Sequence, residues 1–514
     1  MYRLLKCTKD GYITNRIINN SYRASDANTG HAATLDLFQL WDESSILGSE
    51  QPFERSRLLI HFDLNQLRAL TGSVLDISDS SFKATLRLKD IVGGQPVPSN
   101  FTVAVHPLSM SFDEGTGRDV GTYADLDACN WISASVSNGQ FVWNTEGANA
   151  AGALGASNID IIASGNLQDG NGVVNLFKTQ TFSTGEEDLE VDVTTIVSAT
   201  LAGLIPDQGY RISFTEAIEN TSSSLFVKRF ASRHVSNPRL APKLVVQYDD
   251  SFRDNHSNFV FDTSGSLFLF NTVRGQPANI VSGAAATPLI GTNAMTFKLI
   301  SGAIAPSTSS SYSAAFSVDQ FSHGDNFVTG VYVVNLALSS YDPDLIREVQ
   351  SAQSASFTTV WGSNDGTVAF KTGSLKVMTS TANSYIAGAR NYSLSINNLQ
   401  VTYTTNEDPR IRVTVFDSSI EDDLFFSKLP VRRVGSVIEQ IYWRVIDVYS
   451  GEVIIPWDTI NDSTRLSTDS KGMFFDFVPR DLSIGRVYGF EFLIREYGAD
   501  IVIDQNLPSF RVMP

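Results

Sequence analysis

The stretch at 193–248 constrains the fold of this chain more than any other, because it marks where one β-domain ends. Val193–Gly203 is predicted to form a short helix that begins at a threonine cap and carries its apolar side chains on one stripe. Ile205–Gly209 has the turn chemistry that ends such a helix. Tyr210–Phe214 then alternates apolar and polar residues as a half-buried strand does. Phe226–Tyr248 predicts two further strands joined by a Ser-Asn-Pro turn.

The rest of the first domain, which we place at residues 1–248, also shows the two-residue period of β-strands. The clearest strand is Phe82–Lys89, where apolar residues alternate strictly with Lys, Thr and Arg. Similar alternation is present at Leu58–Asp63, Phe101–Val105 and Leu189–Val193. Short strands, long connections rich in Gly, Ser and Asn, and one short helix predict an all-β protein whose N-terminal domain is a jelly-roll β-sandwich.

A polar and charged segment, Asp249–Asn258, marks the start of a second domain, which we place at residues 249–391. This domain is predicted to be a smaller β-sandwich with an exposed Ser-rich loop at Ala305–Ala314. Asp342 and the proline that follows it predict a capped short helix over 345–352. The expected strands are Ser266–Phe270, Met295–Ile300, Val328–Leu338 and Phe357–Trp361.

A third domain is placed at residues 392–514. Turn residues predict one hairpin around Asn406–Pro409 and another around Tyr449–Glu452. With strands at Phe474–Phe477 and Val487–Ile494, this gives about seven strands, the pattern of an immunoglobulin-like β-sandwich. The Cys…Trp…Cys framework is missing, so only the sandwich is predicted.

The charge of the chain disfavours a nucleic-acid partner. The net charge is −17, and the densest basic cluster, Lys228, Arg229 and Arg233, lies within an alternating strand pattern. Binding a phosphate backbone needs a concentrated positive face. No window reaches the roughly 18 apolar residues of a membrane span, and the first residues lack the apolar core and cleavage site of a signal peptide. We expect no nucleic-acid partner, no membrane partner and no Sec export.

Residues that carry chemistry are sparse. The chain has no GxSxG, P-loop or HExxH motif, and no GxGxxG sequence before a helix. Its histidines are far apart in sequence, so each is expected to be an ordinary strand or loop residue rather than a metal ligand. Cys7 and Cys129 are expected to be buried free thiols, with a disulfide between them as the alternative.

Two acidic runs and two oxygen-rich loops complete the search for a catalytic or metal site. Glu186–Glu190 and Glu421–Asp423 offer paired carboxylates, as glycoside cleavage requires, but a solvated loop beside a strand is the favoured interpretation. Gln168–Gly172 and Asn461–Asp462 have oxygens that suit a structural calcium ion, without EF-hand spacing. We therefore expect no enzyme and no catalytic residue. No cofactor is expected either, with structural calcium as the alternative.

Carbohydrate binding by stacking needs several coplanar, exposed aromatic rings. Most of the tryptophans lie beside alternating apolar residues and are expected in the core. The exception is Trp41, which is followed by Asp-Glu-Ser-Ser. Trp41 is therefore the candidate contact for a glycan.

Two sets of segments resemble the disaggregatase-related (DNRLRE-type) jelly-roll domain, a relative of carbohydrate-binding modules. The first set resembles the general domain and consists of Arg57–Asp63, Val193–Gly203, Pro206–Arg211 and Pro242–Tyr248. The second set is similar to a version found in virion structural proteins of tailed bacteriophages and consists of Phe112–Asp119, Asp125–Trp131, Lys228–His234 and Trp361–Val368. The predicted helix departs from the family pattern at Thr200, where an aromatic residue is usual.

This resemblance implies a non-enzymatic structural protein of a tailed-phage virion that assembles in the host cytoplasm. We expect it in the tail, baseplate or neck, in multiple copies within a symmetric assembly, where it binds other virion proteins. One alternative is a host-adhesion or receptor-binding component whose first domain recognises a host-surface glycan. A capsid decoration protein is another. An enzyme that cleaves glycans is the third class, which the motif search disfavours.

Overall fold

The computed structural model describes most of the chain, which is mostly β-structure. The described residues are 1–514 except 20, 42–52, 72–74, 95, 122–127, 136–140, 168–171, 222–224, 284–285, 302–311, 324–325, 380–391, 418–434, 497 and 505–507. They divide into an N-terminal unit, residues 2–69 and 82–247, and a C-terminal unit, residues 1, 70–81 and 248–514. The further boundary between 391 and 392 stays a prediction.

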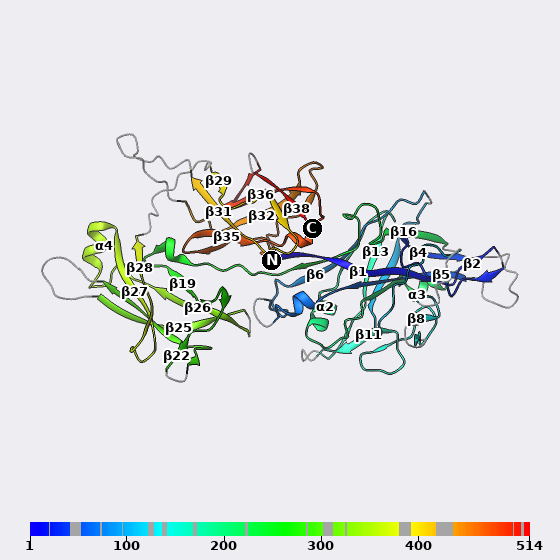
Figure 1. The fold of residues 1–514 in the computed structure, drawn as a ribbon, viewed down its shortest axis with the longest axis horizontal. Helices are drawn as coiled ribbons and strands as arrows, with labels where there is room; N and C mark the ends of the chain where they lie inside the picture. Colours follow the sequence, from blue (N-terminus) through cyan, green and yellow to red (C-terminus); the bar gives the residue numbers. More distant parts are fainter. Residues whose placement is uncertain are drawn as a thin grey trace. The chain divides into compact units, whose positions relative to one another are not determined.

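The N-terminal unit is built on one large sheet that curls into a barrel-like sandwich (Figure 1). Its strands are β1 (Tyr2–Thr14), β4 (Thr34–Trp41), β5 (Phe53–Phe62), β6 (Lys83–Leu88), β7 (Phe101–Pro107), β13 (Lys178–Phe182), β14 (Leu189–Asp192), β15 (Tyr210–Phe214), β16 (Phe226–Ala231) and β17 (Lys243–Gln247). Their order is β13-β7-β15-β5-β1-β17-β6-β14, and β16 joins β5 through β4. Backbone hydrogen bonds between β16 and Lys89–Ile91, which follow β6, close the ring β5-β1-β17-β6-β16-β4.

Aromatic side chains fill the space between the layers of this unit. Phe101 of β7 lies 4.8 Å, between ring centroids, from both Phe182 of β13 and Phe226 of β16. Phe214 of β15 lies 4.7 Å from Phe226, again between centroids. Such pairs stabilise a core beyond the area they bury. The half-exposed pattern predicted for Phe82–Lys89 is confirmed in β6, where buried residues alternate with partly exposed ones.

The predicted helix is present as α2 (Thr194–Leu201), but its predicted threonine cap is wrong. Val193 is the N-cap residue, and it makes no side-chain capping bond. The hydroxyl of Thr194 instead accepts a hydrogen bond from the backbone N–H of Ala84 in β6, which ties the helix to the sheet. Thr200, which stands where the resembling family has an aromatic residue, is buried and donates its hydroxyl to the carbonyl of Ile196.

The half-buried pattern predicted for Tyr210–Phe214 is also wrong, because all five residues of β15 are buried. β15 is a central strand between β5 and β7, and its polar face is covered by the loop around 147–149. Arg211 donates to the carbonyl of Ala148 at 3.2 Å and to the side-chain oxygen of Asn149 at 3.0 Å. The Nη1 of Arg211 is therefore bonded inside the protein rather than by water, whereas its buried Nε has no partner in the described structure.

Short elements complete the N-terminal unit. They are β2 (Ile17–Ile18), β3 (Tyr22–Arg23), β8 (Ser133–Ser135), β9 (Phe141–Val142), β10 (Ala151–Ala153), β11 (Ile161–Asn166), β12 (Val173–Asn175), α1 (Asn65–Arg68) and α3 (Glu216–Glu219). Two smaller apolar clusters lie beneath them, one around Trp131 and Trp143 and one around Ile162 and Ala199.

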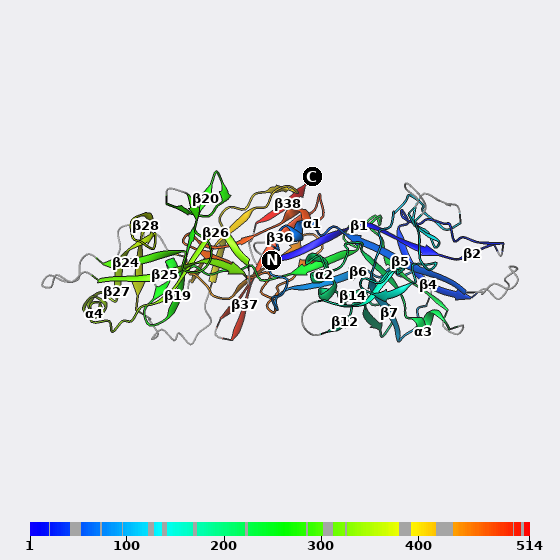
Figure 2. The same ribbon diagram turned by 90° about the horizontal axis from the view of Figure 1, so that it is seen from below.

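The first sheet of the C-terminal unit nearly closes on itself (Figure 2). Its order is β18 (Phe259–Val260), β28 (Ala369–Met378), β27 (Ser354–Gly362), β24 (Met295–Ser301), β25 (Tyr312–His323), β26 (Asn326–Ala337) and β19 (Ser264–Phe270). The first and last strands of this order are consecutive in sequence. The short segment that connects β18 to β19 hydrogen-bonds the residues at the ends of their partner strands. The N–H of Phe261 donates to the carbonyl of Met378 in β28, and the N–H of Asp262 donates to the carbonyl of Leu338, just after β26. The four strands predicted for this region are confirmed.

Other elements of this region refine the predictions. They are β20 (Thr272–Val273), β21 (Gln276–Pro277), β22 (Val281–Ser282), β23 (Thr287–Pro288), α4 (Ile346–Ala352) and the short 3-10 helix η1 (Asn255–Ser257). The predicted aspartate cap of α4 is wrong: Leu345 is the N-cap residue, and Asp342 accepts from the N–H of Asp344 in the preceding turn. Of the predicted loop Ala305–Ala314, residues up to 311 lie outside the described residues, and the last three belong to β25.

The remaining strands form two facing sheets, which we call the β31 sheet and the β36 sheet. The β31 sheet consists of β29 (Tyr392–Ile396), β31 (Arg410–Asp417), β35 (Gly472–Asp476) and β34 (Ser467–Asp469), in that order. The β36 sheet consists of β30 (Thr402–Thr404), β38 (Ser509–Met513), β36 (Val487–Glu496), β32 (Ile441–Asp447) and β33 (Val453–Ile455), with β37 (Ala499–Ile503) also paired to β36. Trp443 of β32 stacks on Phe475 of β35, with ring centroids 4.8 Å apart, so the two sheets share one core.

One of the two hairpins predicted here is confirmed, and the other is wrong. β32 and β33 pair antiparallel across the Tyr449–Glu452 turn, as predicted. The strands on either side of Asn406–Pro409 do not pair with each other. β30 pairs in parallel with β38 of the β36 sheet, whereas β31 pairs with β29 and β35 of the other sheet. The turn residues are therefore a connection between the two layers of a sandwich.

In the described part of the chain, no helix combines the length and the apolar character needed to cross a membrane.

Candidate functional site

Trp41, the predicted glycan contact, lies at the end of β4 and is half-buried. Its ring meets the ring of Phe53 edge-on, with centroids 4.5 Å apart and an interplanar angle of 89°. The guanidinium of Arg55 lies over the other ring, 4.9 Å from its centroid. Residues 42–52 lie outside the described residues. The two rings are perpendicular rather than coplanar, and glycan binding at Trp41 stays a prediction.

Most of the other tryptophans are core residues, as predicted. The buried ones are Trp131, Trp143, Trp361 and Trp443. Trp457 is partly exposed, and the guanidinium of Arg444 lies 3.8 Å from its ring centroid.

The acidic run at Glu186–Glu190 serves the local backbone, as the solvated-loop interpretation expected. The carboxylate of Glu187 accepts hydrogen bonds from the N–H groups of Ser183, Thr184 and Gly185, at 2.7–2.8 Å. These bonds lower the pKa of Glu187 to about 2. The second run, Glu421–Asp423, lies outside the described residues.

Of the two oxygen-rich loops, the structure describes Asn461–Asp462 in full. Residues 168–171 lie outside the described residues. At the other loop, the carboxylate of Asp462 accepts from the hydroxyl of Tyr442 at 2.8 Å and from Arg465 at 3.3 Å. Neighbouring Asp458 accepts from the backbone N–H of Asn461 at 3.0 Å. These oxygens already have protein partners, and a structural calcium ion stays an alternative.

The densest basic cluster is neutralised within the fold. Lys228 is fully buried and donates to Asp90 at 2.5 Å and to the carbonyls of Gly185 and Glu187. Arg229 pairs with Asp36, with nitrogen and oxygen 3.2 Å apart. These cations are therefore structural and do not form a free positive face.

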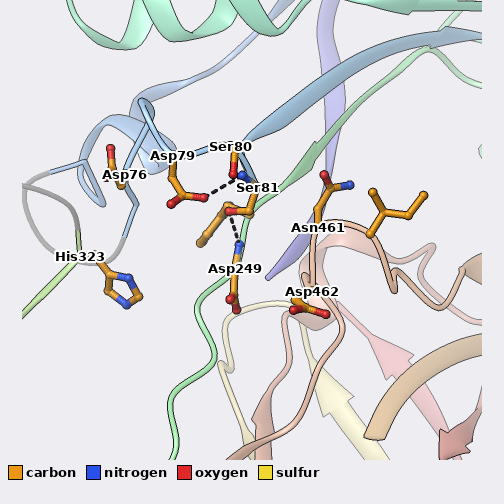
Figure 3. A pocket seen from close by; sticks show the side chains of 10 residues that line it. Asp76, Asp79, Ser80, Ser81, Asp249, His323, Asn461 and Asp462 are labelled. Carbon is orange, nitrogen blue, oxygen red and sulfur yellow. Dashed lines mark hydrogen bonds between the residues drawn. The ribbon is translucent and has the colours of Figure 1, made fainter. Parts of the chain in front are cut away.

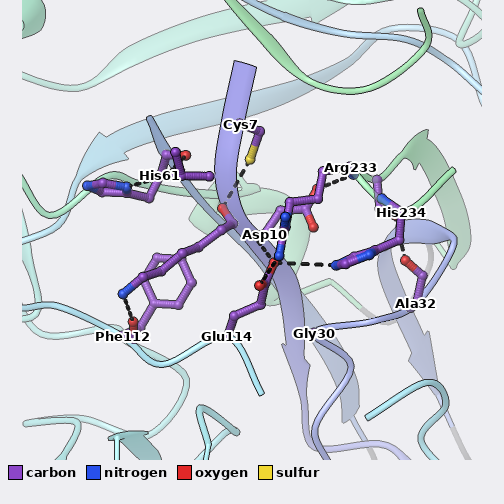
Figure 4. Close-up of polar contacts among 12 residues, drawn as sticks. Cys7, Asp10, Gly30, Ala32, His61, Phe112, Glu114, Arg233 and His234 are labelled. Atoms are coloured by element: carbon purple, nitrogen blue, oxygen red, sulfur yellow. Dashed lines mark hydrogen bonds and ion pairs between the residues drawn. The ribbon is translucent and has the colours of Figure 1, made fainter. Parts of the chain in front are cut away.

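Three loops of the N-terminal unit meet at Glu114 (Figure 4). His31 lies in the loop before β4, Glu114 in the loop after β7, and His234 in the turn after β16. Together with Asp10 of β1 and Arg233, these residues form a group that we call the Glu114 cluster. It contains a set of side chains within reach of one metal ion: one atom each from His31, Glu114 and His234, all within 4.8 Å of one another.

The carboxylate of Glu114 is fixed in one orientation by its neighbours. Its Oε1 accepts the backbone N–H of Asp10 at 2.9 Å and the Nε–H of Arg233, while Oε2 accepts the Nη2–H of Arg233. Paired bonds between a guanidinium and a carboxylate are strong and directional. Oε2 therefore keeps one lone pair without a partner among the described residues.

The two imidazoles lie beside this carboxylate. The ring centroids of His31 and His234 are 4.3 Å apart, with 39° between the ring planes. Nε2 of His234 is 3.6 Å from Oε1 of Glu114, which is too long for a hydrogen bond, and this buried nitrogen has no other hydrogen-bond partner in the described structure. Burial lowers the pKa of His234, and the charges of Arg233 and His31 add to this, so the neutral ring is favoured.

Asp10 brings a second carboxylate to the cluster. Its side chain is fully buried, and its Oδ2 accepts the backbone N–H of Arg233 at 2.6 Å. Its Oδ1 is buried and has no hydrogen-bond partner among the described residues. Burial raises the pKa of Asp10 to about 7, with Glu114 adding to the rise and Arg233 opposing it.

The loops that carry these residues are locked together by Asn28 and by glycines. The side-chain amide of Asn28 donates to the carbonyl of Glu114 at 2.8 Å, and its oxygen accepts from the N–H groups of Gly30 and Gly117. A Cβ on Gly30 would lie 2.0 Å from the carbonyl oxygen of Glu114, so only glycine allows this close approach.

The pairing of β4 with β16 brings the two histidines together. The antiparallel register ends at Thr34 opposite Ala231. Beyond it, Ser232 N–H bonds the carbonyl of Ala33, and the hydroxyl of Ser232 bonds the carbonyl of the preceding residue, Ala32. Two positions beyond the pair of Ala33 and Ser232, the same register would set His31 opposite His234, and their ring centroids are 4.3 Å apart.

Sequence reasoning missed this cluster because it treated the histidines one at a time. The available signal was the pair of segments singled out by the family resemblance: Phe112–Asp119 supplies Glu114, and Lys228–His234 supplies Arg233 and His234. The predicted state of the cysteines is confirmed, since Cys7 and Cys129 are both buried and free. Burial raises the pKa of both thiols, that of Cys129 to about 12.

A hollow about 290 Å³ in volume lies in the C-terminal unit (Figure 3). Its wall is acidic, with Asp76, Asp79, Asp249 and Asp462 around His323. Most of these carboxylates close local turns, as Asp79 does by accepting the N–H of Ser81 at 2.7 Å. The hollow therefore has a polar lining whose hydrogen bonds are largely made within the protein.

Five exposed apolar side chains lie at or beside strand ends of the β36 sheet. Val401 and Tyr449 are 78% and 81% exposed, and Val448, Ile484 and Met513 are also exposed; we call these five residues the apolar rim. Three backbone hydrogen bonds connect these residues or their sequence neighbours across adjacent strands. The N–H of Arg511 donates to the carbonyl of Val401, that of Gly485 to Val512, and that of Val448 to Val487. Adjacent strands lie about 4.8 Å apart, so the rim spans about 14 Å from β30 to β32.

Comparisons with known proteins add little to this geometry. No protein-family model and no curated protein sequence matches the chain. The N-terminal four Ig domains of Dscam1 isoform 6.9 are similar at 10% identity and a TM-score of 0.13, over 50% of this chain and 42% of that chain. Trypsin-activated alpha-2-macroglobulin from Escherichia coli is similar at 8% identity and a TM-score of 0.15, over 100% of this chain and 30% of that chain.

The chain thus spans less than half the length of either solved structure. TM-scores this low carry no argument about fold or function, and the description of β-sandwiches rests on the sheets themselves.

Proposed function

We propose that the protein is a non-enzymatic structural component of a tailed-bacteriophage virion, located in the tail, baseplate or neck. In this proposal the N-terminal unit is a jelly roll and the β31 and β36 sheets form an immunoglobulin-like sandwich. The protein acts through contacts with other virion proteins, in several copies arranged with the symmetry of the particle. The family resemblance of the sequence motivates the proposal, and one structural observation supports it.

That observation is the apolar rim. Monomeric proteins rarely gather large apolar side chains on an exposed surface unless another molecule covers them. Val401 and Tyr449 lose most of their hydration only when a partner packs against this end of the β36 sheet. We assign a neighbouring virion subunit as that partner. An interface of standard size buries on the order of 1,600 Å², and repetition around a ring strengthens many modest contacts through avidity.

The first test is the protein content of the particle. Mass spectrometry of purified, nuclease-treated virions of the phage that encodes this chain is expected to detect it in a stoichiometric number of copies. If intact virions do not contain the chain, the proposed function is wrong.

The second test asks whether the rim makes the contact. A phage that lacks the gene is complemented with the wild-type chain, with Val401→Asp plus Tyr449→Asp, or with the control Val92→Asp. Val92 is 80% exposed, like Val401, but it belongs to the N-terminal unit and is not one of the rim residues. The number of copies of the rim variant per virion is expected to fall at least tenfold, and the control variant is expected to be incorporated as the wild type is. Equal incorporation of both variants would remove the rim from the proposal.

A further inference from the structure

We propose that His31, His234 and Glu114 bind a divalent transition-metal ion of the zinc class, which clips together three loops of the N-terminal unit. This inference is independent of the proposed virion role. It rests on the position of the three side chains, on two buried polar atoms that have no partner in the described structure, and on the charges around them.

The donor set selects the class of metal. Two imidazole nitrogens and one carboxylate oxygen suit zinc and its first-row neighbours, whereas calcium and magnesium prefer oxygen ligands throughout. Zinc bonds to nitrogen and oxygen are about 2.0–2.1 Å long, so neighbouring ligand atoms around a tetrahedral ion lie about 3.3 Å apart. Nε2 of His234 and Oε1 of Glu114 are already 3.6 Å apart. All three ligand atoms lie within 4.8 Å of one another, close to the spacing of ligand atoms around a tetrahedral ion.

The atoms that would meet the ion are short of partners. Nε2 of His234 is buried without a hydrogen bond, and a buried nitrogen in that state is unfavourable. A metal ion supplies the missing partner to this nitrogen. The lone pair left on Oε2 of Glu114 is available as well, since its two oxygens together hold only three hydrogen bonds. A water molecule would take the fourth position, as in zinc sites with three protein ligands.

The surrounding charges accommodate a cation despite the adjacent guanidinium. Arg233 contributes one positive charge, which its ion pair with Glu114 offsets, and Asp10 brings a second carboxylate to the site. This second carboxylate is fully buried, and its Oδ1 has no hydrogen-bond partner among the described residues. Arg233 and the N–H of Asp10 also hold the Glu114 carboxylate in place, as outer partners commonly hold the ligands of metal sites.

The backbone already holds the three loops in positions that one metal ion could cross-link. Asn28 bonds the loops that carry His31 and Glu114, and the register of β4 and β16 sets the two histidines opposite each other. A bound ion would add a third link, between the turn after β16 and the other two loops. It would therefore stabilise the folded unit by RT ln(1 + c/Kd), where c is the free concentration of the ion.

The experiment uses the full chain, stripped of metal with a chelator and then titrated with ZnCl2 in a calorimeter. A parallel titration with Co²⁺ is followed by visible absorption, because cobalt reports nitrogen and oxygen ligands through its d–d bands. The variants are His31→Gln, His234→Gln and both together. The matched control is His61→Gln, a histidine of the same unit that bonds Thr8 at 2.7 Å and takes no part in the proposed site.

The wild-type chain is expected to bind one Zn²⁺, to show cobalt d–d bands and to melt at a higher temperature with zinc. Each single variant should weaken zinc binding about 100-fold or more, since loss of an outer partner alone costs 10–100-fold. The control should stay within about twofold of the wild type. Both histidines are partly exposed, so folding of the variants without zinc can be verified by circular dichroism and by their melting temperature.

Two outcomes would overturn the inference. One is a wild-type chain that binds neither Zn²⁺ nor Co²⁺ at millimolar concentration. The other is a double variant, folded by the criteria above, that binds zinc as tightly as the wild type.

Discussion

Replacing Arg57 by methionine is expected to destabilise the N-terminal unit by about 4–6 kcal/mol. The guanidinium of Arg57 is almost fully buried and donates to both carboxylate oxygens of Glu219, at 3.1 and 2.6 Å. It also donates to the carbonyl of Gly147 at 2.6 Å and lies 5.0 Å from the ring centroid of Trp131. Arg57 therefore joins β5 to α3 and to the loop that contains Gly147.

The magnitude follows from what the substitution leaves behind. Methionine keeps most of the apolar stem but removes the charge, so Glu219 becomes a buried carboxylate without its counter-ion. Breaking one side of a buried pair costs about 3–5 kcal/mol, and a buried carbonyl without its donor about 1–3 kcal/mol. The terms overlap, because the loop around Gly147 can relax. A surface pair is different: Arg87→Met removes a partner of Glu190, and both side chains are more than a third exposed, so we expect under about 1 kcal/mol.

The assay is urea denaturation followed by tryptophan fluorescence, with thermal melting as a second measure. For a unit of this size, each kcal/mol shifts the melting temperature by about 2–4 °C. The double variant Arg57→Met plus Glu219→Met should recover most of the loss, because two apolar side chains can replace a buried ion pair with little cost. The reasoning is refuted if Arg57→Met costs no more than Arg87→Met, or if the double variant is less stable than Arg57→Met alone.

Two further predictions concern acid stability and the close approach at Glu114. Burial, followed by the charges of Arg211 and Arg57, lowers the pKa of His106 to about 3, so only the unfolded chain takes up a proton there between about pH 6.5 and pH 3. The wild type should lose about 1.4 kcal/mol of stability per pH unit of acidification in that range relative to His106→Gln; parallel stability curves would contradict this. Gly30→Ala should lower the stability by about 2–4 kcal/mol, since its Cβ would lie 2.0 Å from the carbonyl oxygen of Glu114. The control Gly94→Ala places its Cβ in open space and should cost only the strain of its positive φ. Equal melting temperatures for the two variants would exclude the clash.

The period-2 patterns of the sequence predicted most strands correctly, because a strand with one solvated face needs that alternation locally. β6 and β14 are such strands, and their exposed positions carry the expected Lys, Arg, Glu and Asp residues. The same rule failed at β15, where Arg211 and Ser213 occupy the polar positions but are buried. The pattern states which residues are polar. Whether a loop covers them depends on residues around 147–149, far away in sequence.

Pairing partners were less predictable than strands. The turn residues Asn406–Pro409 fitted a hairpin, yet β30 pairs with β38 at the far end of the chain. A turn permits two strands to pair but does not require it, because an interlayer connection in a sandwich uses the same residue types. The hairpin between β32 and β33 was predicted from the same kind of turn residues at Tyr449–Glu452, and there the two flanking strands do pair.

The Glu114 cluster shows what the missing pairing information would have supplied. In an antiparallel pair, moving one residue back along one strand moves the partner one residue forward along the other. The alignment of Thr34 with Ala231 therefore sets 33 opposite 232, 32 opposite 233, and His31 opposite His234. A sequence search for ligands at short spacing cannot find such a pair, because its members are joined by register and not by proximity along the chain. Searching for His, Cys, Asp and Glu at matched positions beyond the ends of predicted antiparallel pairs would have found both histidines, and Glu114 would follow only once the loop after β7 was placed.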